Sequence, residues 1–414
     1  MVRRLALAAA LVAASAAPSR GSPLDLFGFG GRSPALAGTG AASTTDYDAV
    51  YLNPAGLADT PRKRATVGGL AGDFRLELDG QPTDTTSPRG LMIGGQVPMP
   101  LGGALRDRVG LGFGFYVPSQ AINRARAPFP GQPTFVLLES RSLVVGLMVA
   151  VGAKVSPRLS VGLGVNSLAV LRGTIDVTLD GAGRFTTQSE QRLLTRFAPI
   201  AGARWRQSRT TDLALVVRAP SRSDYDITVT NDLGTVLPVT LPVVHIAGTA
   251  QYDPLMVVAE AAWRPLAGLT LTGHLAWHRW SAFPRPTLNP VEGDPPQPPL
   301  DFHDTAVPRV SVEYARPALG GTVAARAGYA FLWSPVPDQH RDETLFDNDR
   351  HELAVGVGLA WPGRALPLHV DAWVQAHHLA YRHYARDPDV VAPDREHSTA
   401  GDVLVGGLTV GVDL

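Results

Sequence analysis

Residues 159–179 read LSVGLGVNSLAVLRGTIDVTL, and their alternation decides the fold class. Successive side chains of a β-strand point to opposite faces. One parity of this stretch is almost purely apolar from Leu159 to Leu179, whereas the other parity carries polar side chains such as Arg172 and Asp176. The segment therefore predicts one long strand whose two faces meet different solvents.

The same period of two dominates the chain after residue 64. Many of these runs extend over roughly 11 to 20 residues, whereas ordinary strands average ~5–6 and a tilted membrane strand needs ~9–11. Alternation alone also fits a soluble β-sandwich, so the length of the runs is what favours a membrane barrel. The predicted strands cover 65–78, 88–98, 107–118, 140–153, 159–179, 191–206, 211–231, 241–264, 268–283, 305–315, 321–334, 350–361, 366–384 and 401–413.

The connections between these runs alternate in character. Those beginning near 79, 119, 180, 232, 284, 335 and 385 are long or polar, and those near 99, 154, 207, 265, 316 and 362 are mostly tight. Outer-membrane barrels combine long external loops, short periplasmic turns and an even number of strands. The sequence thus predicts an all-β fold, a transmembrane antiparallel β-barrel of about fourteen strands over residues 63–414, with a soluble periplasmic β-protein as the alternative. Within the barrel, Pro254 is expected to form a bulge in the 241–264 run, with a split of that run into two strands as the alternative.

The N-terminal segment, residues 1–21, has the layout of a secretory signal peptide. Arg3 and Arg4 precede an apolar run that is followed by small residues, and cleavage is expected between residues 16 and 21. The run is too short for a membrane anchor, because a spanning helix needs ~20 apolar residues. We therefore expect an exported protein.

The composition argues against several classes of function. The chain has 37 basic and 37 acidic side chains, so it offers no net positive charge to nucleic acid. It has no cysteine, which removes disulfides and thiolate metal sites. His274 and His278 share a strand face, but the rise per residue places them ~13 Å apart, too far to share a metal ion. No catalytic residues, no metal site and no cofactor are predicted.

The polar parity of the strands must face the barrel interior, because Arg on the lipid face costs ~2–4 kcal/mol near the midplane. This inward set mixes acidic and basic side chains, which can pair with one another in ladders. Alternatively, one or two arginines remain available to a ligand carboxylate, which suits the guanidinium group. Inward apolar residues such as Met148 and Met256 accompany them and favour an amphiphilic ligand. The candidates for binding a ligand carboxylate are Arg196, Arg204, Arg218 and Arg326.

Three motifs, in the same order along the chain, resemble the FadL and toluene-transporter family of outer-membrane transporters for hydrophobic compounds. Residues 28–58 resemble the family's N-terminal hatch, with the Asn-Pro-Ala motif at Asn53, Pro54 and Ala55. Residues 274–283 resemble the strand that ends in a Trp-Ser element. Residues 328–358 resemble the late strand, the Ser-Pro-Val-Pro loop and the Asp-x-Asp-Arg return.

The resemblance implies that an N-terminal hatch, residues 22–62, closes the barrel and that Asn53, Pro54, Ala55 and Gly56 form its gating motif. It also implies passive transport of long-chain fatty acids or other hydrophobic compounds: the ligand is captured in the lumen, the hatch shifts, and the ligand leaves sideways into the outer leaflet. A plug agrees with the geometry, since a barrel of more than ~8 strands is too wide for its side chains to fill. A plain linker is the alternative for this segment.

The lateral opening is expected in the third predicted strand, where Gly112, Gly114 and Pro118 weaken the pairing. Alternatively, Pro118 simply ends that strand. The link at 180–190 is too short for the family's large helical extracellular loop.

The expected location is the outer membrane of a Gram-negative bacterium. The expected partners are a fatty acid or another hydrophobic small molecule and the lipids of the outer membrane, with no nucleic acid, and the expected state is a monomer. The alternative function is an outer-membrane barrel that acts as a docking or assembly partner for secreted proteins.

Overall fold

The computed structural model describes residues 24–119, 133–138, 145–179, 185–232, 244–285, 287–288, 299–338, 344–363, 367–385 and 396–414. The predicted signal peptide lies outside these residues. Among the described residues, no helix is long and apolar enough to cross a membrane.

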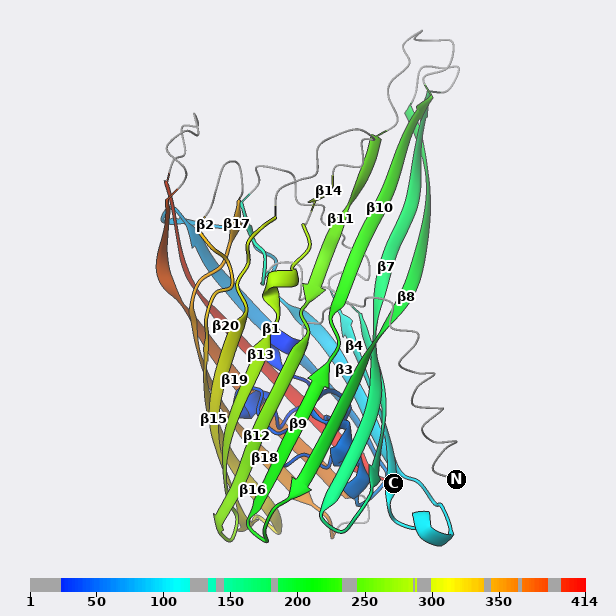
Figure 1. Ribbon diagram of the computed structural model, residues 1–414, viewed down its shortest axis with the longest axis vertical. Coiled ribbons are helices and arrows are strands. Elements are labelled where there is room, and N and C mark those ends of the chain that lie inside the picture. Colours follow the sequence, from blue (N-terminus) through cyan, green and yellow to red (C-terminus); the bar gives the residue numbers. More distant parts are fainter. Residues whose placement is uncertain are drawn as a thin grey trace.

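The fold is a closed barrel of fourteen antiparallel strands, which confirms the predicted class (Figure 1). Two of the fourteen are interrupted, at residues 219–220 and at 254–255, so Pro254 splits its run rather than forming a bulge. The last strand pairs with the first from Arg64 opposite Asp413 to Leu78 opposite Thr399, and this ladder closes the barrel. In chain order the wall consists of β1 (Arg64–Leu78), β3 (Arg89–Pro98), β4 (Val109–Pro118), β6 (Gly146–Lys154), β7 (Leu159–Leu179), β8 (Phe185–Arg206), β9 (Thr211–Arg218) with β10 (Ser221–Asp232), β11 (Val244–Asp253) with β12 (Met256–Leu266), β13 (Leu269–His278), β15 (Thr305–Ala318), β16 (Gly321–Leu332), β18 (Arg350–Trp361), β19 (Leu368–Ala385) and β20 (Glu396–Asp413).

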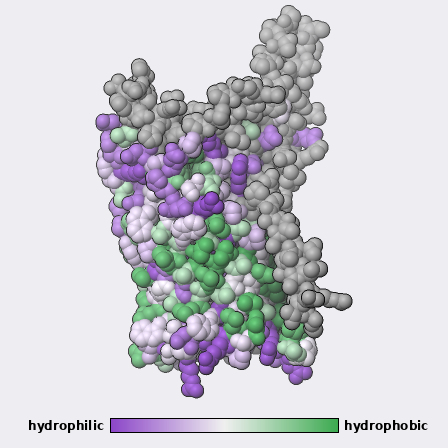
Figure 2. Space-filling view, viewed as in Figure 1, coloured by the Kyte–Doolittle hydropathy of each residue, from purple (hydrophilic) through white to green (hydrophobic). Residues whose placement is uncertain are grey.

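The two faces of the wall meet different surroundings, as the alternation predicts. On β18, Leu353 and Val355 are 61% and 57% exposed on the outer face, whereas their neighbours Glu352 and Ala354 are 1% and 2% exposed. Figure 2 shows hydrophobic residues gathered over the middle and lower part of one side of the barrel, with hydrophilic ones towards both ends. The short turns, such as 155–158 and 207–210, lie at the end that is periplasmic in outer-membrane barrels.

The regular pairing of the wall changes halfway up one side. Strand β7 pairs with β6 as far as Leu168, the partner of Gly146 at the start of β6. Above that rung β7 pairs in parallel with β10, from Leu171 opposite Tyr225 onward. The β7 edge of the β7–β8 hairpin therefore faces β6 in the lower part of the wall and β10 in the upper part, where the hairpin rises beyond the other strands (Figure 1). The strong twist of two-stranded ribbons allows this change of neighbour.

Residues 24–60, which we call the hatch, lie inside the lower half of the barrel (blue in Figure 1). They contain four short helices, α2 (Leu24–Phe27), η1 (Pro34–Leu36), α3 (Ala49–Leu52) and η2 (Pro54–Asp59). Their apolar side chains are buried, with Val50 and Leu57 at 1% and 0% exposure. The hatch thus forms the main core of the lumen together with inward side chains of the wall. The remaining short elements are β2 (Gln81–Pro82), η3 (Gly103–Leu105), β5 (Thr134–Phe135), η5 (Trp280–Ala282), β14 (Thr287–Leu288) and β17 (Leu345–Phe346).

Candidate functional site

Asn53 joins two helices of the hatch to the wall. Its extended backbone ends α3, and its Oδ1 accepts a hydrogen bond of 3.0 Å from the backbone N–H of Ala55 at the start of η2. Its Nδ2 donates to the carbonyl of Ala41 at 2.8 Å and to that of Ala203 in β8 at 3.2 Å. Pro54 suits the first position of η2, where no N–H is needed and its φ is already helical. The fully buried side chain of Asn53 therefore caps η2 and anchors it to the barrel.

A row of four glycines on adjacent strands forms the seat of this motif. Gly110, Gly152, Gly162 and Gly202 lie directly opposite one another across β4, β6, β7 and β8. A Cβ atom on any of them would overlap the hatch, at Leu57, at Pro54 and Ala58, at Pro54 and Ala55, and at Asn53 respectively. The wall needs glycine at these positions because the hatch backbone approaches it without room for a side chain.

Ion pairs hold the opposite side of the hatch. Arg32 donates to both carboxylate oxygens of Glu313 on β15, at 2.9 and 3.0 Å. Arg326 on β16 donates to the same carboxylate at 2.7 Å and also pairs with Asp371 on β19. Because a buried charge is tolerated only when it is paired, each of these groups needs the others in place.

Glu260 on β12 receives the hatch backbone directly. Its carboxylate accepts from the N–H groups of Gly40 and Ala42, at 3.0 and 2.7 Å, and contacts His274 Nδ1 at 2.8 Å. Nearby, Arg309 donates to the carbonyl of Ala37 at 2.7 Å and pairs with Glu352 at 3.1 Å. Inward charges of the wall thus satisfy backbone groups that the irregular hatch leaves open.

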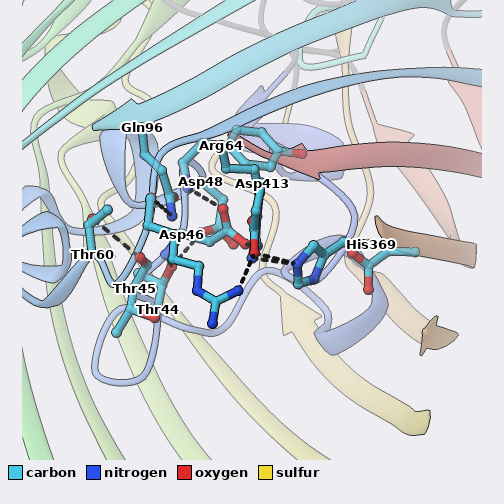
Figure 3. Close-up of polar contacts among 12 residues, drawn as sticks. Thr44, Thr45, Asp46, Asp48, Thr60, Arg64, Gln96, His369 and Asp413 are labelled. Carbon is cyan, nitrogen blue, oxygen red and sulfur yellow. Dashed lines mark hydrogen bonds and ion pairs between the residues drawn. The ribbon is translucent and has the colours of Figure 1, made fainter. Parts of the chain in front are cut away.

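The periplasmic foot of the hatch is fastened where the barrel closes (Figure 3). Arg64 at the start of β1 pairs with Asp46 of the hatch and with Asp413 at the end of β20, and contacts His369 at 2.8 Å. In the same loop Thr44 donates to Asp48. Burial, followed by the neighbouring Asp46 carboxylate, raises the pKa of Asp48 to about 6.

A cavity lies beside the start of the hatch, at the level where β6 and β12 begin and β9 ends. It holds about 500 Å³ of atom-free space, part of it open to solvent. Three buried polar atoms on its lining have no hydrogen-bond partner within the described residues: Asn166 Oδ1, Arg218 Nε and Ser221 Oγ. Met148 and Met256 supply apolar lining. The combination suits a small polar or anionic group with an apolar body.

The predicted carboxylate candidates have different surroundings. Arg204 is 5% exposed and occupied by Asp59 and the carbonyl of Thr44, both in the hatch. Arg326 is held by the ion pairs described above. Arg218 lines the cavity, packs over the Tyr51 ring at 4.0 Å and faces Asp25 of the hatch at the longer distance of 3.8 Å. Arg196 lies in β8 opposite Leu168, and its side chain is outside the described residues.

The glycines of the predicted opening strand face the hatch. A Cβ on Gly112 would overlap Val50 and Leu57, and one on Gly114 would overlap Phe29. Both glycines are paired on each side, to β3 and to β6, without a register shift. The β4–β6 ladder ends at Tyr116 and Gly146, so Pro118 pairs with β3 alone among the described residues. A lateral opening in this strand stays a prediction, and its best place is at Pro118.

Several residues that matter here were not singled out from the sequence. Asp25 and Arg32 belong to the loop-like N-terminal segment, which has no periodicity to assign their partners. The glycines at 152, 162 and 202 stand at the inward parity of three predicted strands, but their alignment in one row depends on the strand register. The described residues contain no group of three or more His, Cys, Asp or Glu side chains that would hold a metal ion.

Residues 10–378 match the model of a family described as "Outer membrane protein transport protein (OMPP1/FadL/TodX)". The chain belongs to this family. FadL/TodX proteins are transport channels of the Gram-negative outer membrane rather than enzymes, and they carry hydrophobic compounds. The recognition from the three sequence motifs is thereby confirmed.

Solved structures of the FadL/TodX family share the fold of this chain at low sequence identity. A FadL homologue from Pseudomonas aeruginosa has a TM-score of 0.64 and 15% identity, with 93% of this chain and 98% of that one covered. The Pseudomonas putida toluene transporter TodX has a TM-score of 0.54 and 12% identity, with 94% and 99% covered. The Ralstonia pickettii toluene transporter TbuX has a TM-score of 0.54 and 14% identity, with 93% of this chain and 99% of that one covered. No curated protein matches the chain.

The glycine row predicts a position-specific effect of one methyl group. Gly162→Ala should displace the 53–58 segment, at a cost of ~1–3 kcal/mol as for other overpacked sites, and raise ion conductance through the barrel. The matched control is Gly273→Ala on β13, where a Cβ meets nothing within 4 Å. The ion conductance of both variants is measured in planar bilayers. Equal conductance of the two variants would show that the glycine row does not seat the hatch.

The raised pKa of Asp48 predicts that this one carboxyl destabilises the hatch at neutral pH relative to mild acid. The folded state binds this proton more tightly than the unfolded state, so stability falls as pH rises from about 4 to about 6, and the cost is fully present at pH 7.5. Asp48→Asn removes that cost, so the hatch amides of this variant should exchange more slowly than those of the wild type at pH 7.5. The free energy of opening the hatch should rise by up to ~2–3 kcal/mol. Hydrogen exchange at pH 5 and 7.5 tests this, with Asp107→Asn in an exposed turn as control. Faster exchange in Asp48→Asn at pH 7.5 would contradict it.

Proposed function

We propose that the protein carries long-chain fatty acids, or other hydrophobic compounds with an anionic head group, through its lumen and releases them sideways into the membrane. The observation that supports this most is the Arg218 cavity. Its guanidinium lies among apolar side chains and donates from Nη1 to the Met256 sulfur at 3.4 Å. Within the described residues its Nε has no hydrogen-bond partner, and its contact to the Asp25 carboxylate is as long as 3.8 Å.

A ligand carboxylate would compete with Asp25 for Arg218. A guanidinium binds a carboxylate best through two parallel hydrogen bonds of about 2.7–2.9 Å, which is closer than the 3.8 Å contact that Asp25 makes. Asp25 lies in α2, the first described element of the hatch, so displacing it loosens one end of the plug.

An apolar cluster in the upper lumen leads towards this cavity. Trp280 and Phe302 are 4% and 5% exposed, and Phe283 stacks on Phe302 with ring centroids 4.6 Å apart. Leu137 belongs to the same core and lines, with Trp280 and Asp25, a second cavity nearer the hatch. The chain of apolar side chains from the loops to the hatch would hold the tail of an amphiphile.

The exit is proposed above the rung that joins Tyr116 and Gly146. There β6 begins, and β4 and β7 have no common neighbour among the described residues beyond this point. Gly146 itself lines the Arg218 cavity, which supports an exit beside the proposed ligand site. Irregular backbone at membrane depth is tolerated where it lines a cavity.

A neutral aromatic hydrocarbon is the second candidate ligand, because solved structures with this fold include transporters named for toluene. Such a ligand has no charge to offer Arg218. The two candidates therefore differ in how much they depend on this one side chain.

The test is binding of a fluorescent fatty acid to the purified protein, with unlabelled oleate and toluene as competitors. Arg218→Gln should weaken oleate binding at least about tenfold, since charge-assisted hydrogen bonds contribute ~1.5–3 kcal/mol. Asp25→Asn removes the internal competitor and should strengthen oleate binding. The control is Arg75→Gln, an exposed arginine that pairs with Asp73.

Each outcome of this test separates the candidates. Toluene displacement that is equally strong in all variants, without any effect of Arg218→Gln on oleate, would favour a neutral ligand and contradict the role of Arg218. Absence of binding by either compound would contradict transport of these ligands and favour a docking role.

A further inference from the structure

The periplasmic rim of the barrel is strongly basic, although the whole chain has no net charge. Basic side chains stand in or beside five successive periplasmic turns, those that follow β3, β6, β8, β12 and β15. Two more basic residues precede β1. The complete set is Arg62, Lys63, Arg106, Arg108, Lys154, Arg158, Arg206, Arg209, Arg264 and Arg316.

Five of these arginines are exposed and have no ion-pair partner within the described part of the chain: Arg106, Arg108, Arg158, Arg209 and Arg316. We take one from each of four turns, Arg106, Arg158, Arg209 and Arg316, and call these four the rim arginines. Most of the acidic side chains nearby are already engaged, and the exposed Asp107 stands between two arginines, Arg106 and Arg108. Asp59 pairs with Lys154 and Arg204, and Asp212 pairs with Arg264 at 2.9 Å. The rim therefore presents positive charge that the protein itself does not neutralise.

The height of the rim relative to the membrane follows from the aromatic and apolar residues around it. Trp205 and Trp263 are 48% and 51% exposed on the outer face, one residue before Arg206 and Arg264. Tryptophan on the outer face of a barrel marks the level of the lipid head groups. The turns extend only a few residues below this level, so the rim arginines reach the depth of the phosphates.

Exposed apolar side chains accompany the basic ones in these turns. Leu105, Val155, Leu266 and Leu319 are 47%, 59%, 68% and 75% exposed. Each lies within three residues of Arg106, Arg158, Arg264 or Arg316. Apolar and basic side chains that alternate at an interface are the combination that binds an anionic lipid surface.

The described loops at the opposite end of the barrel carry both signs. Their acidic side chains are Asp79, Asp84, Asp301, Asp304, Asp338 and Asp349, and arginines such as Arg75, Arg89 and Arg279 stand among them. The exposed basic side chains of the described periplasmic turns point instead to an anionic partner on that side of the membrane.

We propose that the rim arginines bind the phosphate groups of anionic phospholipids in the periplasmic leaflet. The charge lies on successive hairpins along the circumference, beside the membrane-facing tryptophans. Lipids that surround a barrel contact it around its whole circumference, as these charges are spread. A globular acidic protein would instead contact one compact face. Bound lipids would hold the barrel at a set depth and place phosphates against the foot of the wall, whichever compound the lumen carries.

The experiment measures which lipids the full-length mature protein retains. The protein is purified in detergent, offered phosphatidylglycerol and phosphatidylcholine at equal concentration, and the bound lipids are counted by native mass spectrometry. The test variant replaces the four rim arginines by Gln. The matched control replaces four arginines at the other end of the barrel, Arg75, Arg89, Arg279 and Arg285, and so changes the net charge equally.

The rim variant should bind phosphatidylglycerol at least about tenfold more weakly than the wild type, since a basic residue near an anionic surface contributes roughly fivefold in affinity. Phosphatidylcholine should bind equally to all three proteins, and added salt should weaken phosphatidylglycerol binding to the wild type most. Hatch closure, measured as conductance, verifies that both variants fold.

Two results would overturn the proposal. One is phosphatidylglycerol binding that is unchanged in the rim variant. The other is an equal loss of both lipids, which would assign the contact to apolar side chains. If lipid binding is unchanged and the variant instead loses a stoichiometric acidic protein from membrane extracts, the rim serves a protein partner and the lipid assignment is wrong.

Discussion

A barrel of fourteen strands encloses more space than its own side chains can fill, and the remaining architecture answers that constraint. The filling segment is irregular, so its backbone groups must find partners inside the protein at membrane depth. The wall provides them in two ways. On one side four glycines let the hatch backbone come close enough for Asn53 to bond to Ala203 of the wall. On the other side charged groups such as Glu260 accept from hatch N–H groups.

The two kinds of contact have different consequences for movement. Close packing against glycine is apolar, short in range and lost over a small displacement. Buried ion pairs contribute little net stability, because desolvation offsets most of their attraction, but breaking one alone leaves a costly unpaired charge. The hatch is therefore held in one position by contacts of small net stability. In the mechanism that we propose, a ligand that supplies a replacement anion displaces Asp25 from its 3.8 Å contact with Arg218.

Sequence reasoning reached the wall more fully than the site. Strands β7 and β18 have the predicted bounds, and the predicted parity places Glu352 inside and Leu353 outside, because a two-residue period is written in every strand. The β7–β10 pairing was not predicted, since the residues of β7 do not indicate that its neighbour changes from β6 to β10 along its length. Four arginines were equal candidates by parity, and only three-dimensional contacts distinguish Arg218 from Arg204 and Arg326. The glycines of β4 were read as weak points of the wall, whereas their contacts show room made for the hatch.

The most direct test of the account is to cross-link the hatch to the wall. Thr39 in the hatch and Ser311 on β15 touch through their hydroxyls at 2.6 Å, and the chain has no cysteine of its own. A variant with Thr39→Cys and Ser311→Cys can be oxidised to a disulfide, and uptake of a radiolabelled fatty acid can be compared before and after reduction. If the hatch must move, uptake is lost in the oxidised protein and returns on reduction. Full uptake through a completely cross-linked protein would contradict the account.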